Sequence, residues 1–307
     1  MKFEIKSGVF PTMITPFTKN NQLDLDGIDY LVDYYVRSGC VGIFAVCQSS
    51  EMFFLSDAEK ALLMRRVAQA SAGRLQLVAS GHTADDRDTQ IRQLAIMAEN
   101  GADASVIVLN RLAGQDADES VVKRQLESIL LALPDITFGI YECPYPYKRL
   151  ASPDLMRWCA QTGRIVFIKD TCCRMSELLA KREAVQGTPL KIYNANTATL
   201  LDSLQAGIDG YSGIMANFHA DLYVQLFQLQ AARQMETARS LQNFLTLAAL
   251  LEYQLYPVNA KYRRQMDHQA IELYSRAKDA SLWNPTYQIE IRALYDMEQA
   301  WRLKLAR

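Results

Sequence analysis

Residues 165–173 read IVFIKDTCC, an apolar, β-branched run that closes on a lysine. A run of this composition and length favours a β-strand. A strand that is apolar at nearly every position is typical of a parallel strand covered by helices on both faces. A lysine at the end of such a strand needs a physical reason, because burying a charged group is costly.

Seven further runs of the same kind occur along the chain, and each is followed by a helix-like stretch. They are GVFPTMIT (8–15), VGIFAVC (41–47), LQLVASG (75–81), ASVIVLN (104–110), TFGIYEC (137–143), LKIYNAN (190–196) and GYSGIMA (210–216). Eight strand–helix units predict a (β/α)8 TIM barrel, with a doubly wound parallel sheet as the alternative.

Helix ends are marked by residues with known capping preferences. Ser56 followed by Glu59 predicts a capping box, and Ser152 before Pro153 predicts an N-cap with proline at the first helical position. Left-handed C-caps are predicted at the glycines that end helical stretches, namely Gly39, Gly101, Gly163 and Gly207.

The pattern changes after residue 217, because the remaining sequence is helical without strands. We therefore expect residues 1–225 to form the barrel and residues 226–307 a helical extension, packed on the barrel because no glycine- or serine-rich linker separates the two. The basic stretch AKYRRQM, residues 260–266, is expected to be a solvated helix face.

Composition excludes several classes of protein. A net charge of -1 over 307 residues provides no basic surface for nucleic acid. No signal-peptide pattern and no apolar stretch long enough to cross a membrane occur, so we expect a soluble chain that does not bind membranes. The six cysteines lack CxxC spacing, which fits reduced thiols in the cytoplasm.

The active site of a TIM barrel lies at the C-terminal ends of its strands, where Lys169 is expected. Burial would lower the pKa of the lysine and leave a nucleophilic amine, which can form a Schiff base with a carbonyl substrate. A proton relay is also needed, and Tyr141 ends the neighbouring strand. In the alternative interpretation Lys169 reaches the rim or pairs with Asp170, and Tyr141 is a packing residue.

Two loops supply further candidates. The segment QSSE, residues 48–51, offers hydroxyls and backbone N–H groups for the carboxylate of an oxo acid. In YECPYPYKRL, residues 141–150, Glu142 is a candidate acid, base or hydroxyl acceptor, and Lys148 or Arg149 a candidate anion contact. The alternative is a loop that packs its tyrosines on the rim and turns its charges to water.

At these residues the chain resembles the dihydrodipicolinate synthase and N-acetylneuraminate lyase family of class I aldolases. The matching segments occur in the family's order: GVFPTMITPF, CQSSEMFFLSDAEK, YECP, FIKDT and GIDGYSGIMAN. The resemblance implies a Schiff base between Lys169 and pyruvate or another 2-oxo acid, with Tyr141 as proton relay and no cofactor or metal. It also implies a homotetramer or dimer. Substrate contacts are expected from Gln48, Ser49, Ser50, Gly213 and Ile214.

Three departures from the family pattern argue against a true dihydrodipicolinate synthase. Gln48 replaces the first threonine of the family's Gly-Thr-Thr-Gly-Glu motif. Leu112 stands where the synthase is expected to carry a relay tyrosine that comes from a neighbouring subunit, and Pro146 replaces an arginine that binds the second substrate. We therefore predict a lyase or aldolase of different specificity. A dehydratase that uses the same iminium, and a 2-oxo acid sensor with a decayed site, remain alternatives.

A metal-dependent barrel enzyme is the weaker competing class. The three histidines, His82, His219 and His268, are far apart in sequence and lack the spacing of metal ligands. No dinucleotide fingerprint or P-loop motif occurs.

Overall fold

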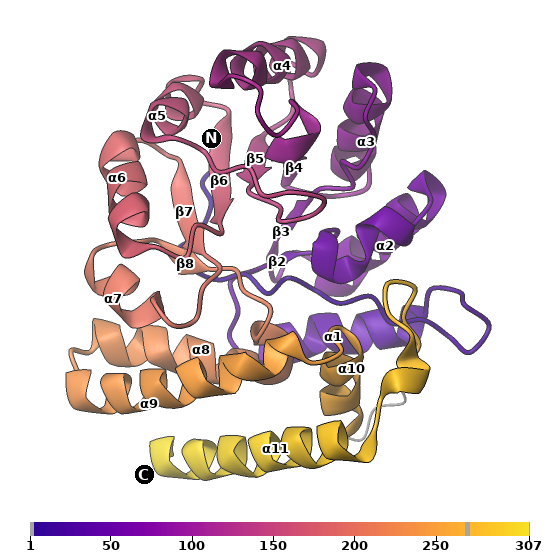
Figure 1. The fold of residues 1–307 in the computed structure, drawn as a ribbon, viewed down its shortest axis with the longest axis vertical. Helices are drawn as coiled ribbons and strands as arrows, with labels where there is room; N and C mark the ends of the chain where they lie inside the picture. The colour runs from indigo at the N-terminus through magenta and orange to yellow at the C-terminus, as the bar shows by residue number, and fades with distance from the viewer. Residues whose placement is uncertain (1–2, 268–270, 307) are drawn as a thin grey trace.

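The computed structural model of the chain describes residues 3–267 and 271–306 (Figure 1). Eight parallel strands form one sheet in the order β1-β8-β7-β6-β5-β4-β3-β2. A parallel bridge between Thr12 and Phe44 joins the two ends of this order, so the sheet closes into a barrel. The predicted TIM barrel is therefore confirmed.

All eight predicted strands are present, although each is shorter than its apolar run. Their bounds are β1 Gly8–Val9, β2 Gly42–Phe44, β3 Gln76–Ala79, β4 Ala104–Val108, β5 Phe138–Tyr141, β6 Ile165–Asp170, β7 Lys191–Asn194 and β8 Gly210–Tyr211.

Eight helices follow the strands and surround the barrel (Figure 1). They are α1 Leu25–Arg37, α2 Asp57–Ser71, α3 Arg87–Glu99, α4 Glu119–Ala132, α5 Pro153–Gln161, α6 Met175–Val185, α7 Leu200–Gln205 and α8 Ala216–Ala231. Short 3-10 turns η1 Gln48–Ser50, η2 Met52–Phe54 and η3 Leu109–Arg111 lie in the loops after β2 and β4.

The predicted caps are confirmed. Ser56 and Glu59 form a reciprocal capping box at α2, and the Ser152 side chain accepts from the Leu155 N–H at the start of α5. The four glycines at the ends of the helical stretches have positive φ, between 64° at Gly163 and 102° at Gly101. Local rules therefore identify these helix ends correctly.

The C-terminal part is helical and lies along α1 and α8 at the lower side of the barrel in Figure 1. It contains α9 Met235–Ala248, η4 Ala249–Tyr253, α10 Val258–Gln265, η5 Ala280–Leu282 and α11 Pro285–Leu305. The expected boundary after residue 225 falls inside α8. Because α8 continues to Ala231, we propose to divide barrel from extension after that residue instead.

The interpretation of the basic stretch in α10 as a solvated face is wrong. Lys261, Arg263 and Arg264 are all at most 1% exposed. Lys261 Nζ lies 3.0 Å from a Glu51 carboxylate oxygen, and both arginines pair with Asp267 at 2.9 and 3.1 Å. These partners are Glu51, from a distant segment, and Asp267, just beyond the end of α10, so the charge pattern alone did not reveal the burial.

Aromatic rings fill the barrel interior beneath the strand ends. The Phe167 ring stacks on Tyr193 with centroids 4.5 Å apart, and Phe10 meets Tyr193 edge-on at 4.9 Å. Phe44 completes the group at 5.9 Å from Phe167. A packed aromatic core of this kind gives the residues above it a rigid base.

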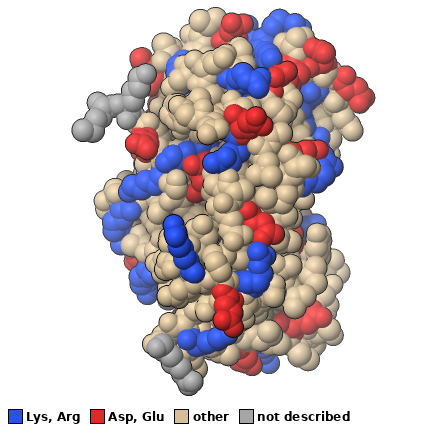
Figure 2. All heavy atoms as spheres, turned by 90° about the vertical axis from the view of Figure 1, so that its left-hand side faces the viewer, with Lys and Arg blue, Asp and Glu red and all other residues tan. Residues whose placement is uncertain are grey.

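Positive and negative side chains are mixed on the face seen in Figure 2, where Lys and Arg are interspersed with Asp and Glu. Within the described ranges, no helix combines the length and apolar character that a membrane span requires.

Candidate active site

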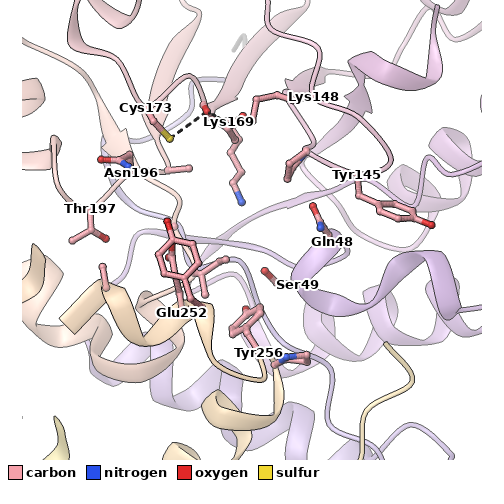
Figure 3. A pocket seen from close by; sticks show the side chains of 18 of the residues that line it. Gln48, Ser49, Tyr145, Lys148, Lys169, Cys173, Asn196, Thr197, Glu252 and Tyr256 are labelled. Carbon is pink, nitrogen blue, oxygen red and sulfur yellow. Dashed lines mark hydrogen bonds between the residues drawn. The ribbon is translucent and has the colours of Figure 1, made fainter. Parts of the chain in front are cut away.

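A cavity of about 500 Å³ opens at the C-terminal ends of the barrel strands (Figure 3). Residues singled out from the sequence that line it are Gln48, Ser49, Tyr141, Lys148, Lys169, Gly213 and Ile214. The cavity therefore lies where a barrel enzyme carries out its chemistry.

Lys169 extends from the end of β6 into this cavity (Figure 3). Its side chain is only 4% exposed, and Nζ lies 4.8 Å from the centroid of the Tyr141 ring and 5.9 Å from that of Phe44. Burial lowers the pKa of the Lys169 amine, as the sequence led us to expect, while weaker effects of Cys47, Cys143 and Glu252 oppose the shift. The lysine neither reaches the rim nor pairs with Asp170.

Tyr141 stands directly beside Lys169, because the two residues are register partners between β5 and β6. The Tyr141 hydroxyl donates to Gln48 Oε1 at 3.5 Å, which is a long hydrogen bond. Burial, together with the neighbouring Cys143 and Cys47, raises the pKa of the phenol well above its ordinary value. Tyr141 is therefore a protonated hydroxyl at neutral pH in the free protein and can donate a proton.

The loop after β2 offers backbone donors to the cavity. Among the described residues, no acceptor lies within hydrogen-bond reach of the Gln48 or Ser49 N–H. The Ser49 hydroxyl donates to Thr12 Oγ1 at 3.2 Å, which holds the loop against the strand-one segment. These two amides are therefore available to an anion.

Ser50, expected to contact substrate, is directed elsewhere. Its N–H donates to the Cys47 carbonyl at 3.1 Å. Its hydroxyl oxygen lies 2.6 Å from the Met13 carbonyl and close to the Ala45 carbonyl, so its one proton is shared between these two acceptors. Ser50 is fully buried and does not line the cavity. Its side chain therefore stabilises the loop and does not contribute a free donor.

Gly213 has no room for a side chain. A Cβ at this position would lie 2.2 Å from the Tyr211 hydroxyl, which is closer than any non-bonded contact allows. Gly213 and the half-buried Ile214 form the wall of the cavity after β8.

Glu142, expected to contact substrate, faces away from the cavity. The carboxylate accepts from the Ala151 and Thr171 N–H groups at 2.9 and 2.8 Å and forms an ion pair with Lys181 on α6. Lys181 also lies 2.5 Å from Asp170. Because neighbouring strand residues point to opposite faces, Glu142 and Asp170 point outward where Tyr141 and Lys169 point inward.

The outward carboxylates have an unusual electrostatic environment. Burial and the nearby Asp170 raise the pKa of Glu142 to about 7, although Lys181 opposes this. The two carboxylates are buried completely and share one amine. This trio joins β5, β6 and α6 directly behind the strand that carries Lys169.

The alternative interpretation of loop 141–150, with tyrosines packed on the rim and charges turned to water, agrees with the structure only in part. Tyr147 packs as expected, since its hydroxyl donates to the Asn110 carbonyl at 2.8 Å. Lys148 is exposed but donates to the Thr171 carbonyl at 2.9 Å while it lines the cavity. Arg149 donates to the Gln115 and Ala117 carbonyls at 3.0 and 2.9 Å, so it is not an anion contact in this arrangement.

The C-terminal extension supplies cavity residues that sequence reasoning missed. Glu252 and Tyr256 reach the cavity from η4 and the segment that follows it (Figure 3), and Lys278 lines the mouth. The Tyr256 hydroxyl accepts from Asn217 Nδ2 at 3.1 Å. Nothing local in the sequence marks these residues, because the chain returns to the barrel mouth after two further helices.

The histidines occupy separate positions. His82 Nδ1 accepts from the Val108 N–H at 3.0 Å, and His219 Nδ1 lies 2.9 Å from Glu298. His268 is outside the described residues. Within residues 3–267 and 271–306, no cluster of three or more His, Cys, Asp or Glu side chains is arranged to hold a metal ion. All six cysteines are free, and only Cys173 is exposed.

Comparison with known proteins identifies the family. The sequence model of the Dihydrodipicolinate synthetase family matches residues 5–267. The chain belongs to this family. Its members are class I aldolases and lyases, so the chain is assigned to that general class.

Curated relatives carry two different names. An N-acetylneuraminate lyase of Rhizobium meliloti is 30% identical over 242 residues, which cover 79% of this chain and 78% of the relative. A 4-hydroxy-tetrahydrodipicolinate synthase of Streptomyces coelicolor is 33% identical over 214 residues, covering 69% and 67%. Similarity to these relatives does not distinguish between the two activities.

Solved structures agree in fold. A dihydrodipicolinate synthase of Bacillus anthracis superimposes with a TM-score of 0.86 at 17% identity, covering 95% of this chain and 98% of that one. A prophage protein of the same family from E. coli K12, solved in complex with pyruvate, gives 0.84 at 19% identity, covering 95% and 98%.

The departures from the family pattern now have structural positions. Leu112 is 5% exposed in the apolar core and does not line the cavity. Pro146 is exposed in the loop after β5 and does not line it either. Of the three departures, Gln48 alone lines the cavity of this chain.

Proposed function

We propose that this chain is a Schiff-base lyase or aldolase that acts on a 2-oxo acid, with pyruvate as one partner of the C–C bond. The observation that carries the proposal is the buried Lys169 amine, whose pKa is lowered, facing a cavity of about 500 Å³ at the barrel mouth. A neutral amine in such a position is a nucleophile for a ketone.

In the proposed reaction, the Lys169 amine attacks the ketone carbon of the 2-oxo acid and loses water to give an iminium ion. Tyr141 gives its proton to the water that leaves in this step. For cleavage, the resulting phenolate, beside the iminium cation, takes the proton from the hydroxyl on the carbon beyond the bond to be broken, and the bonding electrons move toward the iminium nitrogen. The aldehyde departs and an enamine remains. Protonation of the enamine carbon and hydrolysis then release pyruvate and restore the amine.

Tyr141 is the proposed proton carrier in these steps. Its ring lies beside Lys169 Nζ, and its phenol stays protonated at neutral pH because burial raises its pKa. Gln48 accepts its hydrogen bond but has no hydroxyl proton to pass on. We therefore propose that Gln48 orients Tyr141, and that protons are exchanged between Tyr141 and the substrate without a further hydroxyl.

The substrate carboxylate is proposed to bind the N–H groups of Gln48 and Ser49, which have no acceptor among the described residues. This modifies the expectation for Ser50, whose donors are used within the loop. Gly213 lines the cavity and lets its backbone pack closely against the Tyr211 hydroxyl, where a side chain would collide.

The proposal differs from 4-hydroxy-tetrahydrodipicolinate synthesis. Gln48 removes one relay hydroxyl, Leu112 offers no second tyrosine, and Pro146 provides no charge for a second carboxylate. Turnover of pyruvate with aspartate semialdehyde, measured against a panel of other aldehydes, tests this directly. A preference for the semialdehyde would contradict it.

A dehydratase and a sensor remain the competing proposals, and one experiment separates all three. The protein is incubated with a panel of hydroxylated 2-oxo acids, and the products are identified. Release of pyruvate and an aldehyde indicates a lyase, loss of water with an intact carbon chain indicates a dehydratase, and a stable adduct without product indicates a sensor.

Three further properties are proposed alongside the reaction. The resemblance suggests a homotetramer or dimer, and exposed apolar side chains on the extension, such as Leu247 and Ile289, offer contact area. A light-scattering mass equal to one chain would contradict that. A cytoplasmic location and the absence of nucleic-acid partners stay predictions from composition.

A further inference from the structure

One carboxylate in the cavity has no partner within the part of the chain that the structure describes. Glu51 and Glu252 are the two acidic residues that line it. The Glu51 carboxylate accepts hydrogen bonds from Lys261, Ser275 and the N–H groups of Arg276 and Ala277. The half-buried Glu252 carboxylate accepts none from the described residues, and no described cation lies within 4 Å of it.

Glu252 is held at the cavity by the extension. It belongs to η4, the 3-10 turn that follows α9, and Figure 3 shows it on the side of the cavity opposite Gln48 and Tyr145. Glu252 and Lys169 line the same cavity. Burial raises the pKa of the Glu252 carboxyl, and the charge of Lys169 lowers it. An acidic group that lines a binding cavity and has no partner among the described residues is suited to accept a hydrogen bond from a ligand.

The neighbouring wall is neutral and polar. Asn196 and Thr197 follow β7, and Figure 3 shows them on the same side as Glu252. Asn196 Oδ1 accepts from the Thr199 N–H at 3.0 Å, but its Nδ2 donates to no described residue. A free amide donor and a free carboxylate acceptor on one wall match the two hydrogen-bonding functions of a hydroxyl group.

The cations of the cavity lie elsewhere. Lys169 is the proposed nucleophile, Lys148 donates to the Thr171 carbonyl, and Lys278 is exposed at the mouth. A ligand carboxylate placed against the wall of Glu252, Asn196 and Thr197 would meet a like charge, and none of these three residues is a cation, which is unfavourable in a partly desolvated site. A ligand ammonium would share the cavity with these three lysines, and repulsion between like charges would disfavour its binding.

We propose that Glu252 is a specificity-determining residue that selects a second partner bearing hydroxyl groups and no carboxylate. The partner aldehyde places a hydroxyl so that it donates to the Glu252 carboxylate and accepts from Asn196 Nδ2. This inference rests on the proposed Schiff-base reaction and adds the chemical class of the aldehyde to it.

The test compares Glu252→Gln with Glu236→Gln, a control that removes the same charge from an exposed position on α9. Each protein condenses pyruvate with glyceraldehyde, which is hydroxylated, or with succinic semialdehyde, which carries a carboxylate. Hydrogen bonds to a charged group contribute enough that their loss lowers kcat/KM about 10- to 100-fold. The quantity compared is kcat/KM for glyceraldehyde divided by kcat/KM for succinic semialdehyde. We expect Glu252→Gln to lower this ratio by about tenfold or more and Glu236→Gln to leave it unchanged.

Trapping of the pyruvate adduct with borohydride is measured in parallel, because this step precedes the aldehyde. An adduct of normal yield in Glu252→Gln shows that the variant is folded and that the lysine is intact. If Glu252→Gln forms a normal adduct but keeps the wild-type ratio of kcat/KM for the two aldehydes, the role of Glu252 is overturned and the proposed reaction stands. The same holds if the wild-type protein forms the adduct but prefers succinic semialdehyde. Absence of the adduct in the wild-type protein would overturn the proposed function, and the inference with it.

Discussion

Tyr141 and Lys169 are register partners on adjacent strands, and the lysine Nζ lies 4.8 Å from the centre of the tyrosine ring. The pairing follows from the parallel ladder, which places the ends of β5 and β6 at the same edge of the barrel. A nucleophile and a proton carrier are therefore positioned by the backbone itself.

Replacing Tyr141 with Phe removes the hydroxyl and leaves the ring that packs on Phe44 at 5.5 Å. We expect kcat to fall by about 10² or more, because a positioned general acid–base group contributes about that much. Steady-state turnover of the best substrate measures the effect, with Tyr145→Phe at the exposed rim as the matched control. A Tyr141→Phe rate equal to that of the wild type would make Tyr141 a packing residue.

The pH dependence of adduct formation reports the Lys169 amine. Only the neutral amine attacks, and burial lowers its pKa from 10.5, so the reactive fraction at a given pH is larger than for an exposed lysine. The rate of borohydride-trapped adduct formation is expected to rise with pH and level off at an inflection below 10.5. Because Glu252 raises the pKa of the amine, Glu252→Gln is expected to move the inflection to lower pH. An inflection at or above 10.5 contradicts a desolvated amine.

The buried trio behind β6 is expected to control stability. Lys181→Met leaves the Glu142 and Asp170 carboxylates buried side by side without their amine, and breaking a buried pair in this way costs about 3–5 kcal/mol. Chemical denaturation measures the loss, and Lys19→Met, at a side chain 81% exposed, is the control. Equal unfolding midpoints for the two variants would mean that the trio is not essential.

The same trio predicts a dependence of stability on pH. The pKa of Glu142 is raised in the folded state from 4.5 to about 7, so the folded protein binds this proton more tightly than the unfolded chain does. The contribution of Glu142 to stability is therefore full below pH 4.5 and is lost as pH rises to about 7. Glu142→Gln is expected to flatten this part of the stability curve in denaturation series at pH 4.5 and 7.5. If Glu142→Gln keeps the wild-type change in the free energy of unfolding between pH 4.5 and 7.5, that change comes from other groups and the prediction is wrong.

Glu51 links the loop of the proposed carboxylate site to the extension. Its carboxylate lies 3.0 Å from Lys261 Nζ and 2.9 Å from the Ser275 hydroxyl, so Glu51→Gln weakens the contact that holds the two together. We expect a higher KM for pyruvate with a smaller change in kcat, because the loop binds substrate but does not transfer protons. A fall in kcat at constant KM would assign Glu51 a direct role instead.

Much of the barrel follows from local patterns in the sequence. The apolar runs, the glycines with positive φ and the cap residues each depend on a few neighbouring positions, so strands and helix ends were predictable. The positions of Lys169 and Tyr141 follow from the rule that barrel sites lie at strand ends.

The errors have physical causes that differ. Glu142 was misplaced although strand alternation next to Tyr141 already assigns it to the outer face. The burial of Arg263 and the arrival of Glu252 at the cavity depend on how the extension returns to the barrel, which no local pattern encodes. Ser50 was misassigned because a turn directs adjacent residues to different sides.

Trapping with pyruvate and borohydride, followed by intact mass and peptide mapping, tests the Schiff base most directly. We expect one reduced adduct per chain on Lys169, none in Lys169→Ala, and a normal adduct in Lys148→Ala, which removes a second lysine of the same cavity. If pyruvate and a panel of other 2-oxo acids leave Lys169 unmodified, the lysine is structural and the lyase proposal is wrong.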